Sequence, residues 1–174
     1  MSKAAEILVS RMGTFEDFPQ PGILFRDLTP VFADGQSLRA LVDEMVSPFA
    51  GQFDAIAGLE ARGFILAAAA AAEVGVGVVP IRKAGKLPGS VLRESYELEY
   101  GQATFEVSPE VLPAGSRVLI MDDVLATGGT VAASATLIER AGWTVAGVSV
   151  ALELVELGGR ERIGDRLIHS VLSL

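Results

Sequence analysis

Two adjacent acids followed by a run of small residues form the part of this sequence best suited to chemistry. Asp122 and Asp123 come directly after the apolar residues 118–121, and Ala126-Thr-Gly-Gly-Thr130 follows them. The apolar residues are typical of a short buried strand, and the Ala-rich residues 131–141 are typical of a helix. Taken alone, the acids are also compatible with a simple turn, where Asp is common.

The small residues are suited to hold a phosphate at the start of that helix. A helix N-terminus presents free backbone N–H groups and the positive end of its dipole, which attract anions. Gly128 and Gly129 let the backbone approach a ligand closely, and the hydroxyls of Thr127 and Thr130 add donors. The nearby carboxylates can accept hydrogen bonds from sugar hydroxyls. The segment therefore predicts a site for a ribose 5-phosphate.

Residues 118–130 resemble the phosphoribosyl-pyrophosphate signature of type I phosphoribosyltransferases. Four further blocks resemble adenine phosphoribosyltransferases, in the order and at the spacing which that family shows. These blocks are Phe25-Arg-Asp-Leu-Thr-Pro30, Ala57-Gly-Leu-Glu-Ala-Arg-Gly-Phe64, Ile81-Arg-Lys-Ala-Gly-Lys-Leu-Pro-Gly89 and Ser95-Tyr-Glu-Leu-Glu-Tyr-Gly101. The resemblance implies a purine salvage enzyme that transfers ribose 5-phosphate from phosphoribosyl pyrophosphate to adenine, giving AMP and pyrophosphate.

The resemblance assigns binding residues to each part of the substrates. For ribose 5-phosphate it implies the acid pair and the small residues, namely Asp122, Asp123, Ala126, Thr127, Gly128, Gly129 and Thr130. For the pyrophosphate group it implies Glu60, Ala61, Arg62, Lys83 and Lys86. For adenine it implies Phe25 and Arg26, whose backbone groups would read the edge of the base, with Val124 against one face. An ordinary core position is an equally good interpretation of Val124.

Three residues are expected to act on the reaction itself: Glu99, Arg62 and Lys86. Arginine presents a planar fork suited to phosphate, and cations beside the pyrophosphate stabilise the charge that builds up as the anomeric C–O bond breaks. The resemblance places the family's loop glutamate at Glu99, where it would take the proton that adenine N9 loses, with Tyr100 positioning the loop. Plainer interpretations exist for Arg62 and Glu99. A surface ion pair with Glu60 is the alternative for Arg62, although its position at a strand end favours function. For Glu99 the residue pattern alone favours a half-exposed strand.

The net charge of −8 argues against a general nucleic-acid surface, because phosphate backbones require clustered cations. Two of the three lysines in the chain, Lys83 and Lys86, nevertheless lie in one short segment beside Arg82 and Gly85. This clustering predicts a local anion site on an acidic protein. The alternative interpretation is an ordinary solvated turn.

Strands and helices alternate along the chain, which predicts one α/β domain over residues 1–174 with a Rossmann-like parallel sheet flanked by helices. The expected helices are 5–12, one that opens at Ser37, 63–74 and 131–141. The expected strands are 54–58, 76–81, 118–121, 144–152 and 167–172, with a long loop at 82–95, a two-stranded excursion at 96–107 and an irregular segment at 15–30. The resemblance adds a small N-terminal hood at about residues 1–33 and a flexible catalytic loop at about residues 82–101.

Three of the resembling blocks begin where an expected strand ends, after Gly58, Ile81 and Met121. In parallel sheets ligands bind beyond the carboxyl ends of the strands. We therefore expect these blocks to converge on one edge of the sheet.

The resemblance also implies Mg²⁺, held mainly by the substrate, and a homodimer; direct contact of Asp122 or Asp123 with the metal is left open. The lack of cysteine, of a signal peptide and of a membrane-length apolar run favours a cytoplasmic protein that does not bind a membrane. His169 and Trp143 are interpreted as structural.

Two rival functions differ in class. One is a transferase for xanthine, hypoxanthine or guanine, against which Phe25-Arg-Asp27 and Glu99 count. The other is a non-catalytic sensor that binds phosphoribosyl pyrophosphate to regulate transcription. The net charge of −8 and the lack of an added DNA-binding domain count against the sensor.

Overall fold

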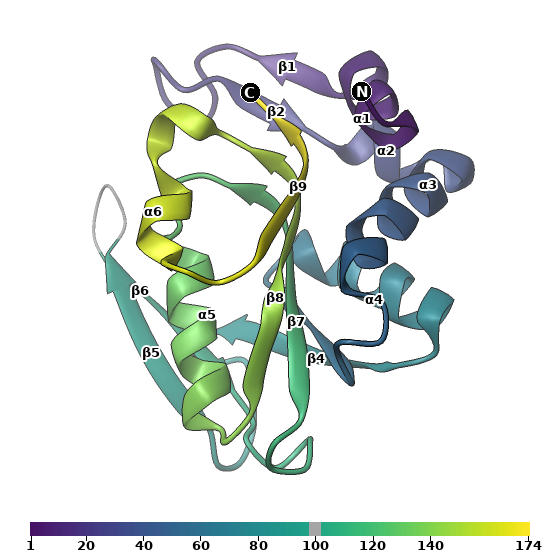
Figure 1. Ribbon diagram of the computed structural model, residues 1–174. Coiled ribbons are helices and arrows are strands. Elements are labelled where there is room, and N and C mark those ends of the chain that lie inside the picture. The colour runs from purple at the N-terminus through teal and green to yellow at the C-terminus, as the bar shows by residue number, and fades with distance from the viewer. Residues whose placement is uncertain (98–101) are drawn as a thin grey trace.

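The computed structural model of this chain describes residues 1–97 and 102–174, which form a seven-stranded sheet with helices on both faces and a separate two-stranded ribbon. The strands of the large sheet lie in the order β5-β6-β4-β3-β7-β8-β9. Figure 1 shows the sheet running through the middle of the molecule, with both termini at the same end. The α/β fold expected from the sequence is confirmed.

Five adjacent strands of this sheet are parallel, and they are β4 (Gly77–Lys83), β3 (Ala55–Leu59), β7 (Arg117–Leu125), β8 (Thr144–Glu153) and β9 (Ile168–Ser173). Every residue of β3 is buried, as expected for a central strand covered by helices on both faces. The hairpin of β5 (Leu92–Glu97) and β6 (Gln102–Val107) extends the sheet, because β6 pairs antiparallel with β4. The expected two-stranded excursion is thus an extension of the main sheet.

Helices cover the two faces of the sheet (Figure 1). On one face lie α1 (Lys3–Arg11), α3 (Gly35–Val46) and α4 (Gly63–Val74), and on the other lie α5 (Gly129–Arg140) and α6 (Gly159–Ile163). Three short helical turns complete the chain, α2 (Thr29–Phe32), η1 (Ser47–Phe49) and η2 (Val155–Leu157). A hydrophobic core fills the space under each helical layer, so the sheet is held from both sides.

The N-terminal segment forms a small antiparallel ribbon of β1 (Gly13–Phe15) and β2 (Phe25–Asp27). It lies at the end of the molecule where the parallel strands finish (Figure 1). The sequence led us to expect an irregular segment over residues 15–30. The sequence did not predict the two strands of the ribbon, because each is only 3 residues long and too short to show the alternation of apolar and polar residues typical of a strand.

Several element boundaries differ from those expected, and the difference at β7 bears on function. The strand continues past Met121 to Leu125, so Asp122 and Asp123 belong to the strand itself. Pairing with β8 extends as far as Leu125 opposite Glu153, which explains why polar residues remain extended. The expected loop at 82–95 was also too long, since β4 ends at Lys83 and β5 begins at Leu92.

Other expectations hold closely. The Ala-rich helix α4 spans Gly63–Val74 as predicted. Helix α3 begins at Gly35 and not at Ser37, because the carboxylate of Asp34 caps it by accepting the Ser37 N–H at 2.9 Å. Trp143 is buried in the core.

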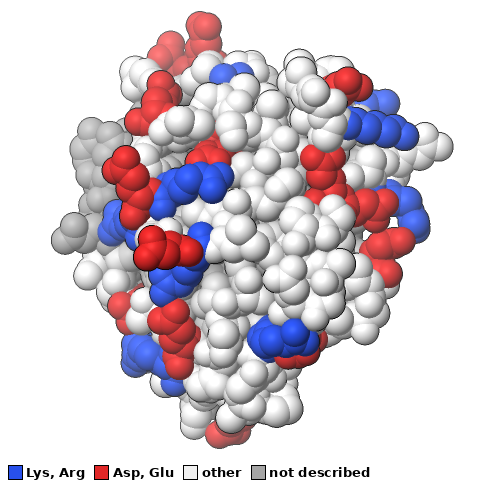
Figure 2. All heavy atoms as spheres, in the orientation of Figure 1, with Lys and Arg blue, Asp and Glu red and all other residues white. Residues whose placement is uncertain are grey.

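On the face in Figure 2, basic side chains lie beside acidic ones and do not gather into one patch. Ion pairs among the described residues include Arg140 with Glu94 at 2.8 Å and Arg166 with Glu139 at 2.7 Å. Within the described ranges, no helix combines the length and apolar character needed to cross a bilayer.

The close packing of Gly147 against Phe49 yields a stability prediction. A Cβ at Gly147 would overlap the buried Phe49 ring. We expect Gly147→Ala to lower the free energy of unfolding by about 1–3 kcal/mol, as overpacking does in other cores. Urea titration would measure it. Gly77→Ala is the matched control in a strand, since a Cβ there meets nothing within 4 Å. Equal stability of the two variants would contradict the packing argument.

Candidate active site

A cleft of about 360 Å³ opens at the carboxyl end of β7. Its lining comes from five regions far apart in the sequence: the N-terminal ribbon, the residue before α4, the end of β7 with the start of α5, β5, and the residue after β8. The lining residues are Ile23, Leu24, Phe25, Arg26, Arg62, Tyr96, Asp122, Asp123, Val124, Ala126, Thr127, Gly128, Gly129, Thr130 and Leu154. Of the three blocks expected to converge at the strand ends, the two after Gly58 and Met121 line this cleft.

The turn between β7 and α5 has the geometry of a phosphate cradle. Gly128 precedes α5 with φ +77°, in the left-handed region that favours glycine. A Cβ at Gly128 would lie 2.5 Å from the carbonyl oxygen of Gly159, so the turn also packs too closely for a side chain. Gly129 and Thr130 open the helix, and the N–H groups of its first turn have no partner within the helix. These donors border the cleft and can bind an anion.

Asp122 and Asp123 form a closely coupled acid pair beside the cradle. Asp123 is buried and Asp122 half-buried, and the Asp123 N–H donates to Asp122 Oδ1 at 2.9 Å. Burial, together with the charge of Asp123, raises the pKa of Asp122 well above its ordinary value. Burial also raises the pKa of Asp123, although Arg62 opposes that rise. Gly63 leaves the necessary room, because a Cβ there would lie 2.8 Å from Asp122 Oδ1.

Arg62 crosses the cleft from the start of α4 to the acid pair. Its Nε lies 2.7 Å from Asp123 Oδ2, and its guanidinium lies 5.2 Å from the centre of the Phe25 ring. The alternative of an Arg62–Glu60 ion pair is wrong, since Glu60 pairs with Arg82 at 3.3 Å. Arg62 therefore carries a positive charge between the base side and the sugar side of the cleft.

The ribbon supplies the residues expected to hold adenine. The Phe25 ring packs edge-on against Phe18 with their centres 5.1 Å apart. Arg26 turns its side chain back along the ribbon, where Nη1 donates to Thr14 Oγ1 at 3.1 Å. Arg26 nevertheless lines the cleft, and Val124 lines the same cleft from β7. The expected adenine residues thus border one space.

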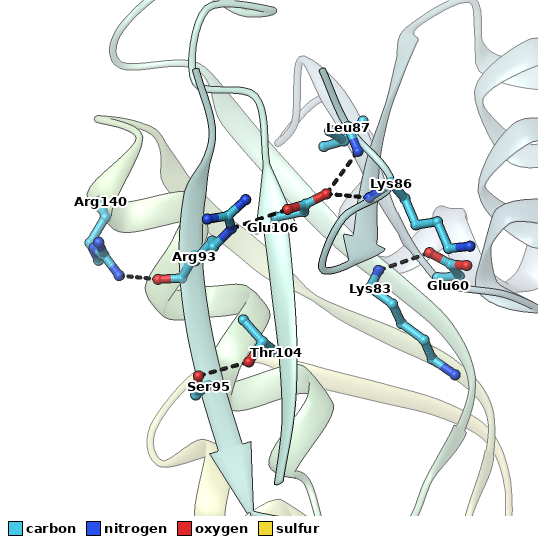
Figure 3. Close-up of polar contacts among 9 residues, drawn as sticks. All are labelled: Glu60, Lys83, Lys86, Leu87, Arg93, Ser95, Thr104, Glu106 and Arg140. Carbon is cyan, nitrogen blue, oxygen red and sulfur yellow. Dashed lines mark hydrogen bonds and ion pairs between the residues drawn. The ribbon is translucent and has the colours of Figure 1, made fainter. Parts of the chain in front are cut away.

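The other residues expected to bind pyrophosphate lie beside this cleft, on neighbouring strand ends. In the described part of the chain, the lining includes Arg62 but not Glu60, Ala61, Lys83 or Lys86. Glu60 follows β3, and its Oε2 accepts the Lys83 N–H at 2.8 Å at the end of β4 (Figure 3). Burial alone would raise the pKa of Glu60, but the N–H of Lys83 and the charge of Arg82 lower it overall.

Four lining residues were missed by the sequence analysis. Tyr96 is buried on β5, where burial and the charge of Asp122 raise its pKa. Leu154 directly follows β8, so the strand-end rule could have found it. Ile23 and Leu24 had no signal, because only the ribbon brings them to the cleft. Glu99 and Tyr100 lie outside the described residues, so their predicted roles stay predictions.

Comparison with known proteins identifies the family of this chain. Residues 32–165 match the family described as phosphoribosyl transferase domain. An adenine phosphoribosyltransferase of Clavibacter sepedonicus is 60% identical over 99% of this chain and 90% of that protein. The crystal structure of the Rhodothermus marinus adenine phosphoribosyltransferase superposes with a TM-score of 0.92, at 44% identity, over 98% of both chains. The chain belongs to the adenine phosphoribosyltransferase family.

A further crystal structure of this family shows what one relative binds. The Saccharomyces cerevisiae adenine phosphoribosyltransferase was crystallised with adenine and an imino-altritol bisphosphate. It is 37% identical, with a TM-score of 0.93, over 99% of this chain and 100% of that chain. Family membership makes the present chain an enzyme, a glycosyltransferase of the phosphoribosyl class.

The raised pKa of Asp122 predicts that its ionised carboxylate lowers the stability of the ligand-free protein. A carboxyl whose folded pKa exceeds its unfolded value costs stability, and the cost grows as pH rises from the unfolded pKa to the folded pKa, above which it is fully present. We expect Asp122→Asn to raise the melting temperature of the ligand-free enzyme at pH 8 by about 2–4 °C, the shift that ~1 kcal/mol gives in a domain of this size. The gain should shrink on going to pH 5.

The control for this prediction is Asp54→Asn. The Arg117 side chain and its N–H lower the pKa of Asp54 to about 2, so neutralising it should bring no gain. Thermal melts from pH 5 to pH 8 would compare the two variants. A lower melting temperature for Asp122→Asn at pH 8 would contradict the burial argument.

Proposed function

We propose that this protein makes AMP and pyrophosphate from adenine and phosphoribosyl pyrophosphate, a purine salvage reaction. The observation that carries the proposal is the single cleft in which a phosphate cradle, an acid pair and an aromatic ribbon meet. Ligands of the yeast relative, adenine and a bisphosphate, match the two halves of that cleft in chemistry.

The ribose 5-phosphate group occupies the end of β7. Its phosphate lies in the cradle of Ala126, Thr127, Gly128, Gly129 and Thr130, where helix N–H groups and hydroxyls donate to it. Its hydroxyls donate to Asp122 and Asp123. Both acids have a raised pKa, so hydrogen bonds from the sugar supply the stabilisation that burial has removed.

The pyrophosphate group lies over the ends of β3 and β4, near Glu60, Ala61, Arg62, Lys83 and Lys86. Arg62 exchanges its ion pair with Asp123 for the incoming phosphates. This exchange frees the Asp123 carboxylate for the sugar and places a bidentate donor on the pyrophosphate. Lys83 and Lys86 add charge on the same side, at the end of β4 and in the turn that follows it.

Adenine lies between the ribbon and Val124. Phe25 covers it with an apolar ring, and the backbone at Phe25 and Arg26 reads its edge. Bases with the opposite hydrogen-bond polarity at the 6-position would leave a buried group unpaired, which costs enough to exclude them.

The reaction forms a bond between adenine N9 and the anomeric carbon while the bond from that carbon to pyrophosphate oxygen breaks. The electron pair leaves on pyrophosphate, where Arg62 and Lys86 stabilise the growing charge. The N9 proton passes to the carboxylate of Glu99, and Tyr100 positions that loop. Water would otherwise capture the ribosyl centre, and the catalytic loop expected at about residues 82–101 is the proposed cover that excludes it; residues 98–101 of that loop lie outside the described residues.

Mg²⁺ is the proposed cofactor, and when bound it neutralises part of the pyrophosphate charge. In the part of the chain that the structure describes, no group of three His, Cys, Asp or Glu side chains suits a metal ion. The donors that remain near the substrate are Asp122 and Asp123. Such a set fits a metal held mainly by substrate oxygens and water.

The protein acts in the cytoplasm as a homodimer, without binding nucleic acid or membrane. The absence of cysteine, the net charge of −8 and the mixed charges in Figure 2 support this setting. Exposed apolar side chains on α4 and β4, Ile65, Val74 and Val78, support the dimer because a partner would cover them.

An assay with four bases tests the function. The purified enzyme with phosphoribosyl pyrophosphate and Mg²⁺ should form nucleotide from adenine at least about 100-fold faster than from hypoxanthine, guanine or xanthine. Asp123→Asn should reduce adenine turnover at least about tenfold, because it removes a charged acceptor for the sugar. Tight binding of phosphoribosyl pyrophosphate without product from any base would favour the sensor function.

Glu99→Gln tests the proton transfer. We expect kcat to fall by about 10²–10⁴-fold while AMP binding changes less than about twofold, since the amide cannot take a proton. Glu97→Gln makes the same chemical change two positions earlier and should retain activity. An unchanged kcat in Glu99→Gln would end the proton-transfer assignment.

A further inference from the structure

A buried carboxylate outside the cleft holds the turn that carries Lys86. Glu106 lies on β6 with 0% of its surface exposed. Its Oε1 accepts the backbone N–H groups of Lys86 and Leu87, each at 2.7 Å, and its Oε2 lies 3.3 Å from Arg93 Nε. Figure 3 shows Lys86 and Leu87 of the turn beside this carboxylate, each joined to it by a dashed line. Nothing in the sequence analysis singled out Glu106.

The turn has the shape of an anion-binding nest, and Glu106 is the anion that fills it. Gly85 adopts φ +83°, which lets successive N–H groups point into one concavity. Burial alone would raise the pKa of Glu106, but the N–H groups of Leu87, Gly85 and Lys86, with Arg93, lower it to about 2. The carboxylate is therefore ionised at neutral pH.

The neighbouring backbone donors are also occupied by the protein itself. The Lys83 N–H donates to Glu60 at 2.8 Å, and the Ala84 N–H donates to the Thr104 carbonyl at 2.9 Å. Arg82 Nη1 lies 3.4 Å from the Lys86 carbonyl oxygen. With these groups occupied, the segment can offer a phosphate its side chains but not these N–H groups.

The Lys86 side chain extends from the turn in a defined direction. Figure 3 shows the Lys86 side chain extending from the turn on the side away from Glu106, toward the end of β3 where Glu60 lies. A lysine side chain is long and loses much rotational freedom when it binds. Fixing its backbone reduces the number of positions that its ammonium group can sample.

We propose that Glu106 is a positioning residue for phosphoribosyl pyrophosphate, which it serves by fixing the turn so that Lys86 meets the pyrophosphate group. The inference rests on the proposed role of Lys86. Glu106 cannot attract the substrate directly, because it carries the same sign of charge. A purely structural role would be to support the pairing of β4 with β6, where Glu106 lies opposite Arg82.

The affinities for two ligands distinguish the positioning role of Glu106 from a purely structural one. Phosphoribosyl pyrophosphate contacts both the cradle and the turn, whereas AMP lacks the pyrophosphate group and contacts the cradle and the base site alone. We expect Glu106→Gln to weaken phosphoribosyl-pyrophosphate binding about tenfold, because a neutral acceptor holds the N–H groups less strongly. AMP binding should change less than about twofold. Equal weakening of both ligands, or of neither, overturns the proposal.

Thr104→Val is the matched control. It removes a 2.8 Å contact between the hydroxyls of Ser95 and Thr104 on the same two strands, and it leaves the turn intact (Figure 3). Both dissociation constants should stay within about twofold of the wild-type values. Titration calorimetry with the full chain gives all of these values under one set of conditions.

A double-mutant cycle tests whether Glu106 acts through Lys86. Lys86→Ala should itself weaken phosphoribosyl-pyrophosphate binding about tenfold or more, and Glu106→Gln should then add less than about twofold. A full tenfold further loss in the double variant overturns the positioning role. If Lys86→Ala leaves the affinity unchanged, the proposed function of the turn fails together with the inference. If only Glu106→Gln is without effect, the inference fails and the proposed function stands.

Gly85→Ala keeps the proposal testable should Glu106→Gln fail to fold. A Cβ at Gly85 meets nothing within 4 Å, so the substitution strains only the backbone at φ +83°. The substitution should weaken the binding of phosphoribosyl pyrophosphate and leave the binding of AMP unchanged. Gly75→Ala is its control, because Gly75 has φ +76° and an equally open Cβ position at the far end of α4. Unchanged affinity in Gly85→Ala overturns the proposal.

Discussion

The parallel pairing of β3 with β7 is the constraint on which the site depends. Their register sets Gly58 opposite Met121, so both strands reach the same edge of the sheet. Arg62 follows one strand, and the acid pair lies at the end of the other. The 2.7 Å contact between Arg62 and Asp123 is a consequence of that register. A shift of one residue would turn each side chain to the opposite face and separate the two groups.

Four carboxylates at this edge have two different tasks, which their pKa values distinguish. Glu60 accepts a backbone N–H from the last residue of β4 and Glu106 accepts N–H groups from the turn that follows, and the pKa values of both are lowered. Asp122 and Asp123 are buried with fewer compensating donors, and their pKa values are raised. Glu60 and Glu106, with lowered pKa values, stabilise the folded protein as carboxylates. Asp122 and Asp123, with raised pKa values, destabilise it when ionised, and hydrogen bonds from a bound substrate can offset that cost. Functional sites commonly carry such local strain at the expense of stability.

Close packing of backbone complements this arrangement of charge. Gly128 packs against Gly159, and Gly63 makes room for Asp122, so the chain approaches the substrate groups without intervening side chains. The enzyme family to which the chain belongs transfers phosphoribosyl groups, and this edge has both the free helix donors and the carboxylates that such a substrate requires. In the proposed function, specificity for adenine falls to the ribbon, an element outside the large sheet.

The sequence by itself determined the α/β class, helix α4 over Gly63–Val74, and the cradle at Ala126–Thr130. These features depend on neighbours within one or two turns of chain, so composition and spacing reveal them. Only the tertiary structure decided the partner of Arg62, the extension of β7 through Asp122 and Asp123, and the ribbon that brings Ile23 and Leu24 to the cleft. It likewise decided the burial of Glu106 beneath the Lys86 turn. Each of these contacts joins residues that are distant in sequence, and which of many possible partners is chosen depends on how the whole sheet packs.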